Sequence, residues 1–138
     1  MDFETFEGKL AERGCTIGKL KRSLYRKLAE QLPHDLEIRA AGEGLSKENG
    51  SYAPVIVTAE TVYIAYAVGS SGGAELVAVA RDIVTGVEVT GRILRKLTIV
   101  TGADRFVVTA MSKKQAHMIA EELGGAGPAG AAGVQSRN

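Results

Sequence analysis

The sequence predicts an α+β fold in which about seven short antiparallel strands form a small barrel of two bent sheets, closed by a C-terminal helix. Residues 55–110 consist of short apolar segments separated by turn residues. A capped amphipathic helix begins after Ser112, and another amphipathic stretch, 16–32, precedes the strands. With 138 residues, of which 45% are hydrophobic, the chain has room for a single domain.

The N-terminal third is predicted to be helical. Residues 2–14 carry three apolar residues at helical spacing and end at Gly14. Residues 16–32 carry an apolar stripe at spacings of three and four, and Thr16 and Pro33 are the expected N-cap and stop. The stripe consists of Ile17, Leu20, Leu24, Leu28 and Leu32.

The middle of the chain is predicted to be a run of strands. They are 36–41, 55–58, 61–67, 75–80, 83–90, 93–100 and 106–110. Glycine, serine, asparagine and proline dominate 42–54, which predicts a long loop that is mobile or functional. Ala59 and Glu60 are expected to turn a hairpin, residues 70–73 form a second turn, and Gly86 marks a bulge.

The last predicted element is a helix with a capping box, Ser112 to Gln115, and Gly124 at its C-terminal cap. Its apolar stripe is narrow, which suits a helix that closes one end of a barrel. We therefore expect an N-terminal segment at 1–15, a folded domain at 16–123 and a disordered Gly/Ala-rich tail at 124–138.

The composition excludes several classes of function. Aromatic residues make up only 5% of the chain and tryptophan is absent, so base stacking on single-stranded nucleic acid is not expected. The net charge of +1 gives no general attraction to DNA or anionic lipid. An acidic N-terminus without an apolar run, and no stretch able to span a bilayer, indicate a cytoplasmic protein.

No set of residues predicts catalysis, a cofactor or a metal. Cys15 precedes a predicted helix but has no partner histidine nearby in the sequence, so a structural role is favoured. His117 and Glu121 stand four residues apart on the last helix, but two ligands are too few for a structural metal site. The glycines after residue 124 match a dinucleotide pattern without the strand and helix that it requires.

Two groups of cations are the candidate binding surface. The first, five cations within nine residues of stretch 16–32, consists of Lys19, Lys21, Arg22, Arg26 and Lys27. The second consists of Arg92, Arg95 and Lys96, with Arg92 and Lys96 on one face of a predicted strand and Arg95 on the other. Either group could meet an anionic partner. The favoured interpretation is a solvated face whose long side chains cover apolar neighbours.

The segments VIVTAETVYIAY, RDIVTGVEV and GRILRKLTIVTG, followed by SKKQAHMIAEEL, resemble bacterial pleckstrin-homology-like (PH-like) domains of the YokE-like type. The resemblance covers roughly residues 16–123 and rests on hydrophobic pattern and turn chemistry. It implies a PH-like barrel with a leading helix, and homo-oligomerisation through sheet edges or outer faces. Phosphoinositide binding is not favoured, because Lys47 is the only base in loop 42–54.

We therefore expect a non-enzymatic module for protein–protein contact or homo-oligomerisation. The alternative is binding of nucleic acid or anionic membrane through the basic face of helix 16–32. These predict different responses to salt, because a partner held by its phosphates is released steeply as salt rises.

Overall fold

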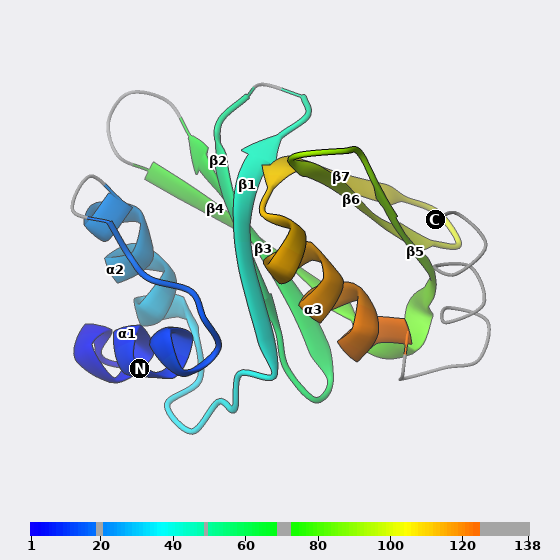
Figure 1. The fold of residues 1–138 in the computed structure, drawn as a ribbon. Coiled ribbons are helices and arrows are strands. Elements are labelled where there is room, and N and C mark those ends of the chain that lie inside the picture. The colour runs from blue at the N-terminus through cyan, green and yellow to red at the C-terminus, as the bar shows by residue number, and fades with distance from the viewer. Residues whose placement is uncertain (19–20, 49, 69–72, 125–138) are drawn as a thin grey trace.

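The computed structural model describes residues 1–18, 21–48, 50–68 and 73–124, and it shows one seven-stranded antiparallel sheet, curled into a half-barrel, with three α-helices (Figure 1). The strands are β1 (Ala40–Ser46), β2 (Tyr52–Val57), β3 (Thr61–Val68), β4 (Gly73–Ala80), β5 (Val84–Thr90), β6 (Arg95–Thr101) and β7 (Arg105–Met111). The helices are α1 (Phe3–Glu12), α2 (Arg22–Gln31) and α3 (Lys113–Gly124). The predicted fold class is confirmed.

The sheet is continuous, with the order β4-β3-β2-β1-β7-β6-β5. β1 joins the two halves of the sheet, because it pairs with β2 along one edge and with β7 along the other. The prediction of two bent sheets is therefore wrong, because all seven strands belong to one sheet. The two free ends of the order, β4 and β5, are the edge strands.

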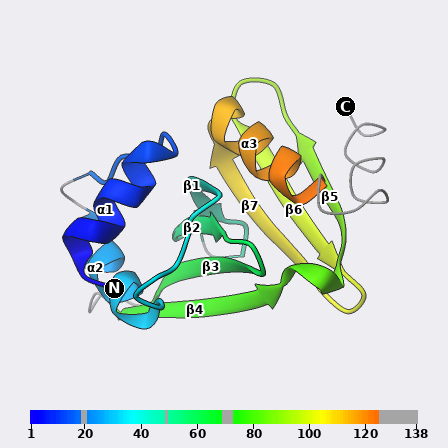
Figure 2. The same cartoon turned by 90° about the horizontal axis from the view of Figure 1, so that it is seen from below.

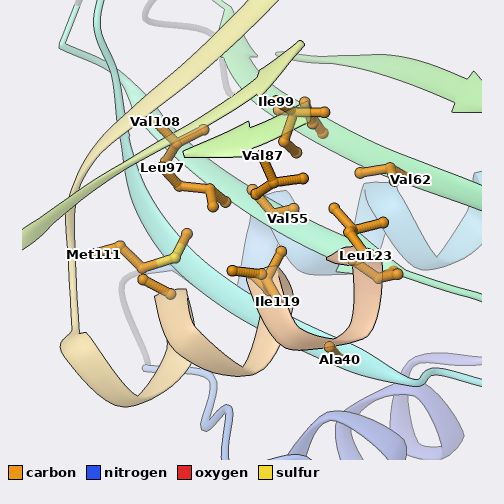
Figure 3. Packing of buried hydrophobic residues seen from close by; sticks show 14 of the residues in the cluster. Ala40, Val55, Val62, Val87, Leu97, Ile99, Val108, Met111, Ile119 and Leu123 are labelled. Carbon is orange, nitrogen blue, oxygen red and sulfur yellow. The ribbon is translucent and has the colours of Figure 1, made fainter. Parts of the chain in front are cut away.

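An inner core fills the concave side of the sheet, where α3 lies against β1, β5 and β6 (Figure 3). Alternate residues of each strand point into it, as the period of two requires. Its largest fully buried side chains are Val55, Val57, Ile64, Leu97, Ile99, Met111 and Ile119. The prediction that α3 closes the curved sheet is confirmed.

An outer core lies on the opposite face of β1–β4, covered by α1 and α2 (Figure 2). Ile56 of β2 faces this core, whereas its neighbours Val55 and Val57 face the inner one. β2 is thus buried on both faces, which explains its unbroken apolar run. Residues 1–15 belong to this packing, since Phe6 and Leu10 are fully buried.

β1 differs most from its prediction. Residues 36–39 are not strand, and residues 42–46, expected to be loop, form most of β1. The glycines that suggested a loop are required by close packing. A Cβ on Gly44 would lie 2.5 Å from Val108 Cγ1 and would overlap the Thr109 carbonyl oxygen, and one on Gly42 would lie 3.0 Å from Ile119 Cδ1. The connection between β1 and β2 is short, and Lys47 is exposed in it.

The helix predicted over 16–32 begins later. α2 starts at Arg22 after Lys21, while Thr16 is exposed and outside the helix. Its most buried side chain is Tyr25, which the leucine stripe did not include. Leu20 lies outside the described residues, as does most of the turn predicted at 70–73, and the tail prediction concerns residues outside them after Gly124. Gly124 itself is the last residue of α3 rather than a cap beyond it.

The turns around the remaining strands follow the sequence more closely. β2 and β3 form the predicted hairpin, in which the Thr58 hydroxyl donates to the Thr61 carbonyl at 3.0 Å and accepts from the Thr61 amide at 3.1 Å. The register of β5 against β6 shifts between Val84 and Gly86, which confirms the predicted bulge.

Candidate protein-binding edge

The strand β5 forms one edge of the sheet and, among the described residues, pairs with β6 alone. Val87 and Val89 are buried in the inner core, which fixes the strand against α3. The opposite face is polar: Thr85 is exposed, and Glu88 forms an ion pair at 3.4 Å with Arg105 of β7. An edge strand exposes backbone amides and carbonyls along its free side, and these can pair with another strand.

Exposed apolar residues lie at both ends of β5. Of the large hydrophobic residues that are exposed in the described chain, three of the four are here: Ile83 is 53% exposed, Ile93 88% and Leu94 55%. Each end also carries an exposed charge, Asp82 beside Ile83 and Arg92 beside Ile93. We call residues 82–94 the β5 edge segment.

The prediction that residues 93–100 form a strand is wrong at its start, because β6 begins at Arg95. Gly91 has a φ of 108°, and a Cβ there would lie 2.5 Å from the Leu94 carbonyl oxygen. The Arg95 guanidinium donates to the carbonyls of Gly91, at 2.6 Å, and Arg92. The loop 91–94 is therefore built to turn tightly, and it directs Ile93 to solvent.

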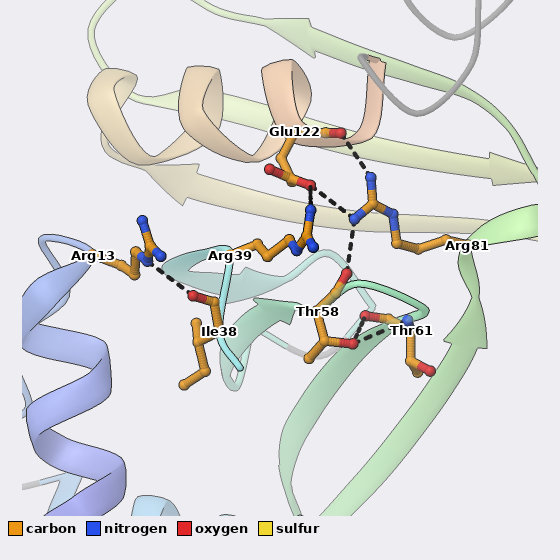
Figure 4. A network of polar contacts seen from close by, with 7 residues as sticks. All are labelled: Arg13, Ile38, Arg39, Thr58, Thr61, Arg81 and Glu122. Atoms are coloured by element: carbon orange, nitrogen blue, oxygen red, sulfur yellow. Dashed lines mark hydrogen bonds and ion pairs between the residues drawn. The ribbon is translucent and has the colours of Figure 1, made fainter. Parts of the chain in front are cut away.

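The other end of β5 is anchored by Arg81, whose side chain is 10% exposed. Its guanidinium donates to the Thr58 carbonyl, the Glu122 carboxylate and the Glu122 carbonyl, each at 2.8 Å (Figure 4). These bonds tie the 3₁₀ turn Arg81–Ile83 to the β2–β3 hairpin and to the end of α3. Ile83 is thus exposed from a fixed turn.

An open hollow of about 650 Å³ lies beside this turn. Its lining includes Arg39 and Arg81, together with Glu60 and Asp82. Glu122 lies 2.8 Å from Arg81 and 3.9 Å from Arg39. Acidic groups therefore balance both guanidinium groups, so the hollow offers no excess positive charge to an anion.

The opposite edge, β4, is less open. α2 packs against β4, and Leu76 of β4 is partly buried in the outer core. The two edge strands therefore differ in what surrounds them, and within the described residues β5 has exposed large apolar residues beyond both of its ends.

The predicted basic surface is divided by the structure. Lys21 lies 4.1 Å from the centre of the Tyr52 ring, and Arg22 and Arg26 lie 4.7 and 4.8 Å from that of Phe3. These side chains therefore lie over aromatic rings, an arrangement in which long basic side chains cover apolar neighbours. Lys27 is exposed, and Lys19 lies outside the described residues.

The second cationic group is also separated. Arg92 is in the loop rather than on a strand, so it does not share a strand face with the exposed Lys96. The guanidinium of Arg95 is used within the loop. Figure 1 places α2 and β5 on opposite sides of the molecule, so the two predicted groups do not form one surface.

A buried polar cluster joins the outer helices to the sheet, and no pattern in the sequence pointed to it. The Tyr25 hydroxyl donates to the Glu43 carboxylate at 2.5 Å and lies 3.0 Å from the Tyr52 hydroxyl and 4.0 Å from Cys15 Sγ. Burial, and then the Glu43 charge, raise the pKa of the Cys15 thiol to about 12. A thiol held in its protonated form is a poor nucleophile, which supports a structural role for Cys15.

The predicted capping box of α3 is only half formed. The Gln115 amide donates to the Ser112 hydroxyl at 3.2 Å. The Gln115 side chain does not return the bond to Ser112. It accepts from the Glu43 amide at 3.0 Å and donates to the Gly14 carbonyl at 3.4 Å. Gln115 thus connects α3 to β1 and to the N-terminal layer.

The described residues form neither a cluster of potential metal ligands nor a helix that could span a membrane. His34, His117 and Glu121 are exposed, and no group of three or more potential ligands occurs in the described chain. Within the same residues, none of the helices has the length and apolar character needed to cross a bilayer. No protein-family model and no curated protein matches this sequence.

Proposed function

We propose that this chain is a non-enzymatic protein-binding module of the bacterial PH-like type, and that it contacts partners through the β5 edge segment. The observation that carries the proposal is the edge strand β5 with exposed isoleucines beyond both of its ends, Ile83 and Ile93. A partner strand added to β5 would gain main-chain hydrogen bonds, and apolar side chains of the partner would cover the two isoleucines.

The PH-like assignment is supported by the strand order and by the terminal helix inside the curl of the sheet. The lone buried cysteine suits a reducing compartment, so we expect the module to act in the cytoplasm. The arrangement of Lys21, Arg22 and Arg26 over aromatic rings does not favour the alternative, a nucleic-acid or membrane surface on α2.

Peptide selection tests the proposal without a known partner. Random ten-residue peptides displayed on phage would be selected against the full chain, and binding would then be measured by fluorescence anisotropy. Lysines on an edge strand oppose strand addition, so we expect the double variant T85K/T90K to weaken binding at least tenfold. The matched control A78K, at an exposed residue of the other edge strand, should leave binding unchanged.

Two outcomes contradict the proposal. One is that no peptide is selected. The other is that selected peptides bind T85K/T90K as well as the unchanged chain, or lose binding only in A78K.

A further inference from the structure

We infer that one end of the molecule, formed by the loop between β5 and β6 and by the start of α3, docks on an anionic membrane surface. Ile93 and Leu94 at the tip of the loop enter the interfacial layer of the bilayer, and the basic side chains around them meet the lipid headgroups. We call this end the basic tip. It consists of Arg92, Ile93, Leu94, Lys96, Lys113 and Lys114. The inference goes beyond the proposed function and shares residues 92–94 with the β5 edge segment.

The structure brings together cations that are separated in the sequence. Arg95 pairs in register with Met111, so the loop before β6 lies beside the residues that begin α3. Figures 1 and 2 both show this loop next to the start of α3. Four exposed cations meet here, and within the described residues none of the four forms an ion pair. They are Arg92, Lys96, Lys113 and Lys114.

Acidic side chains are absent from both segments that form the basic tip. Neither 90–97 nor 109–117 contains aspartate or glutamate. The nearest carboxylate before them, that of Glu88, already pairs with Arg105 at 3.4 Å. Lys113 and Lys114 begin α3, where the helix dipole opposes positive charge, so helix stability does not explain them. This end therefore attracts an anionic surface although the whole chain is nearly neutral.

The loop is built so that its tip can leave water. Ile93 is 88% exposed and Leu94 55% exposed. The carbonyls of Gly91 and Arg92 already accept hydrogen bonds from the Arg95 guanidinium. Entering an apolar layer therefore does not leave these two carbonyls unpaired, which would be costly there. Because Arg95 also holds the turn, little order has to be created on binding.

The combination of exposed apolar and basic side chains favours a membrane over a nucleic acid. A nucleic acid would pair with the cations but would leave Ile93 and Leu94 among phosphates and water. An anionic bilayer provides charged headgroups for the cations and apolar chains beneath them for the tip.

Co-sedimentation of the full chain with lipid vesicles tests the inference. Vesicles of phosphatidylcholine with about one-third phosphatidylserine should bind the chain at least about tenfold more tightly than vesicles of phosphatidylcholine alone, and added salt should release it. I93S/L94S and K113E/K114E should each weaken binding at least about tenfold, because the first removes the apolar contact and the second reverses two charges.

The matched controls change the same kinds of residue elsewhere. L45S replaces an exposed leucine of β1, and K27E/K47E reverses two exposed lysines outside the basic tip. Both should bind vesicles as the unchanged chain does, and circular dichroism would confirm that all variants fold.

A fluorescent reporter separates insertion of the tip from a purely electrostatic contact. The chain contains no tryptophan, so the variant L94W carries a single one. Its emission should shift to shorter wavelength when phosphatidylserine vesicles are added, whereas the emission of L45W should not.

The inference is overturned if phosphatidylserine vesicles do not bind, if either tip variant binds them as the unchanged chain does, or if the L94W emission does not shift. Binding to a DNA duplex instead of vesicles, lost in K113E/K114E, would assign the cations to nucleic acid and would overturn it as well. The proposed function is tested without lipid, through T85K/T90K, so either conclusion can fail while the other stands.

Discussion

The hydroxyl of Tyr25 is the contact on which the buried polar cluster depends. It donates to the Glu43 carboxylate, so Y25F would leave that partly buried carboxylate without its donor. A hydrogen bond to a charged group contributes about 2 kcal/mol, and we expect Y25F to lower the free energy of unfolding by that amount. Urea denaturation would measure it.

Tyr52 provides the control for this substitution. Its hydroxyl contacts the Tyr25 hydroxyl, and removing it leaves the bond from Tyr25 to Glu43 in place. Y52F should therefore lower the free energy of unfolding clearly less than Y25F does. Equal losses of unfolding free energy in Y25F and Y52F would show that the hydrogen bond to Glu43 adds no stability of its own.

The buried thiol of Cys15 should make the free energy of unfolding decrease as the pH rises above 9. Its pKa is raised from 9.0 to about 12 in the folded chain, so between these values the unfolded chain releases a proton that the folded chain keeps. The contribution is fully present below pH 9 and is lost as the pH rises, at up to about 1.4 kcal/mol per pH unit. Urea titrations from pH 8 to 11 should show a shallower decline for C15A than for the unchanged chain. Identical slopes would contradict the raised pKa.

The strand β1 needs glycine where β7 approaches it. In G44A the new Cβ would overlap the Thr109 carbonyl oxygen and lie 2.5 Å from Val108 Cγ1, so the β1–β7 ladder must move. We expect a loss of about 3 kcal/mol or more, measured by thermal unfolding. Gly86 is the control, because a Cβ added there would lie 4.0 Å from its nearest neighbour, Val100 Cβ. G86A should change the free energy of unfolding by less than about 0.5 kcal/mol. A mild effect of G44A would mean that β7 does not pair with β1 as described.

The end of α3 is held by Arg81 rather than by its own capping residues. R81K keeps the charge but cannot keep three hydrogen bonds in that geometry, so we expect a loss of about 2 kcal/mol in urea denaturation. Arg39 reaches the same carboxylate at 3.9 Å with a largely exposed side chain, and R39K should cost little. The opposite ranking would show that α3 is anchored elsewhere.

Sequence patterns predicted the elements well where apolar residues alternate and turns are short. The hairpin at Ala59 and Glu60, the bulge at Gly86 and the closing helix after Ser112 all follow from local chemistry. β1 could not be predicted, because its glycines are needed for contacts with β7 and α3, which are distant in sequence. In the sequence, a glycine in a loop cannot be distinguished from a glycine that is required by close packing against a neighbouring strand.

The candidate edge was only partly visible in the sequence. A sheet edge was expected to mediate assembly, but which strand would form it depended on the closure of β1 on β7. Ile93 was predicted to lie within a strand, and the contacts of Arg95 across Gly91 place it in a loop instead. The candidate cations were identified by charge alone, and charge does not reveal that Lys21 or Arg22 lies over an aromatic ring.

The module as a whole is nearly neutral, so peptide binding at the β5 edge segment should depend weakly on salt. The charge is +1, and apolar contact with main-chain pairing is little screened. We expect the dissociation constant of a selected peptide to change less than about tenfold between 50 mM and 500 mM salt, measured by fluorescence anisotropy. A steep loss with salt would favour a charged interface over strand pairing.

Amide hydrogen exchange along the two edge strands tests most directly whether β5 is the strand that binds. In the full chain, we predict that exchange in residues 84–90 slows when a selected peptide is added, while exchange in residues 73–80 stays the same. Exchange in β5 that is unchanged by the peptide, or protection that develops in β4 instead, would contradict the proposal that β5 is the binding edge.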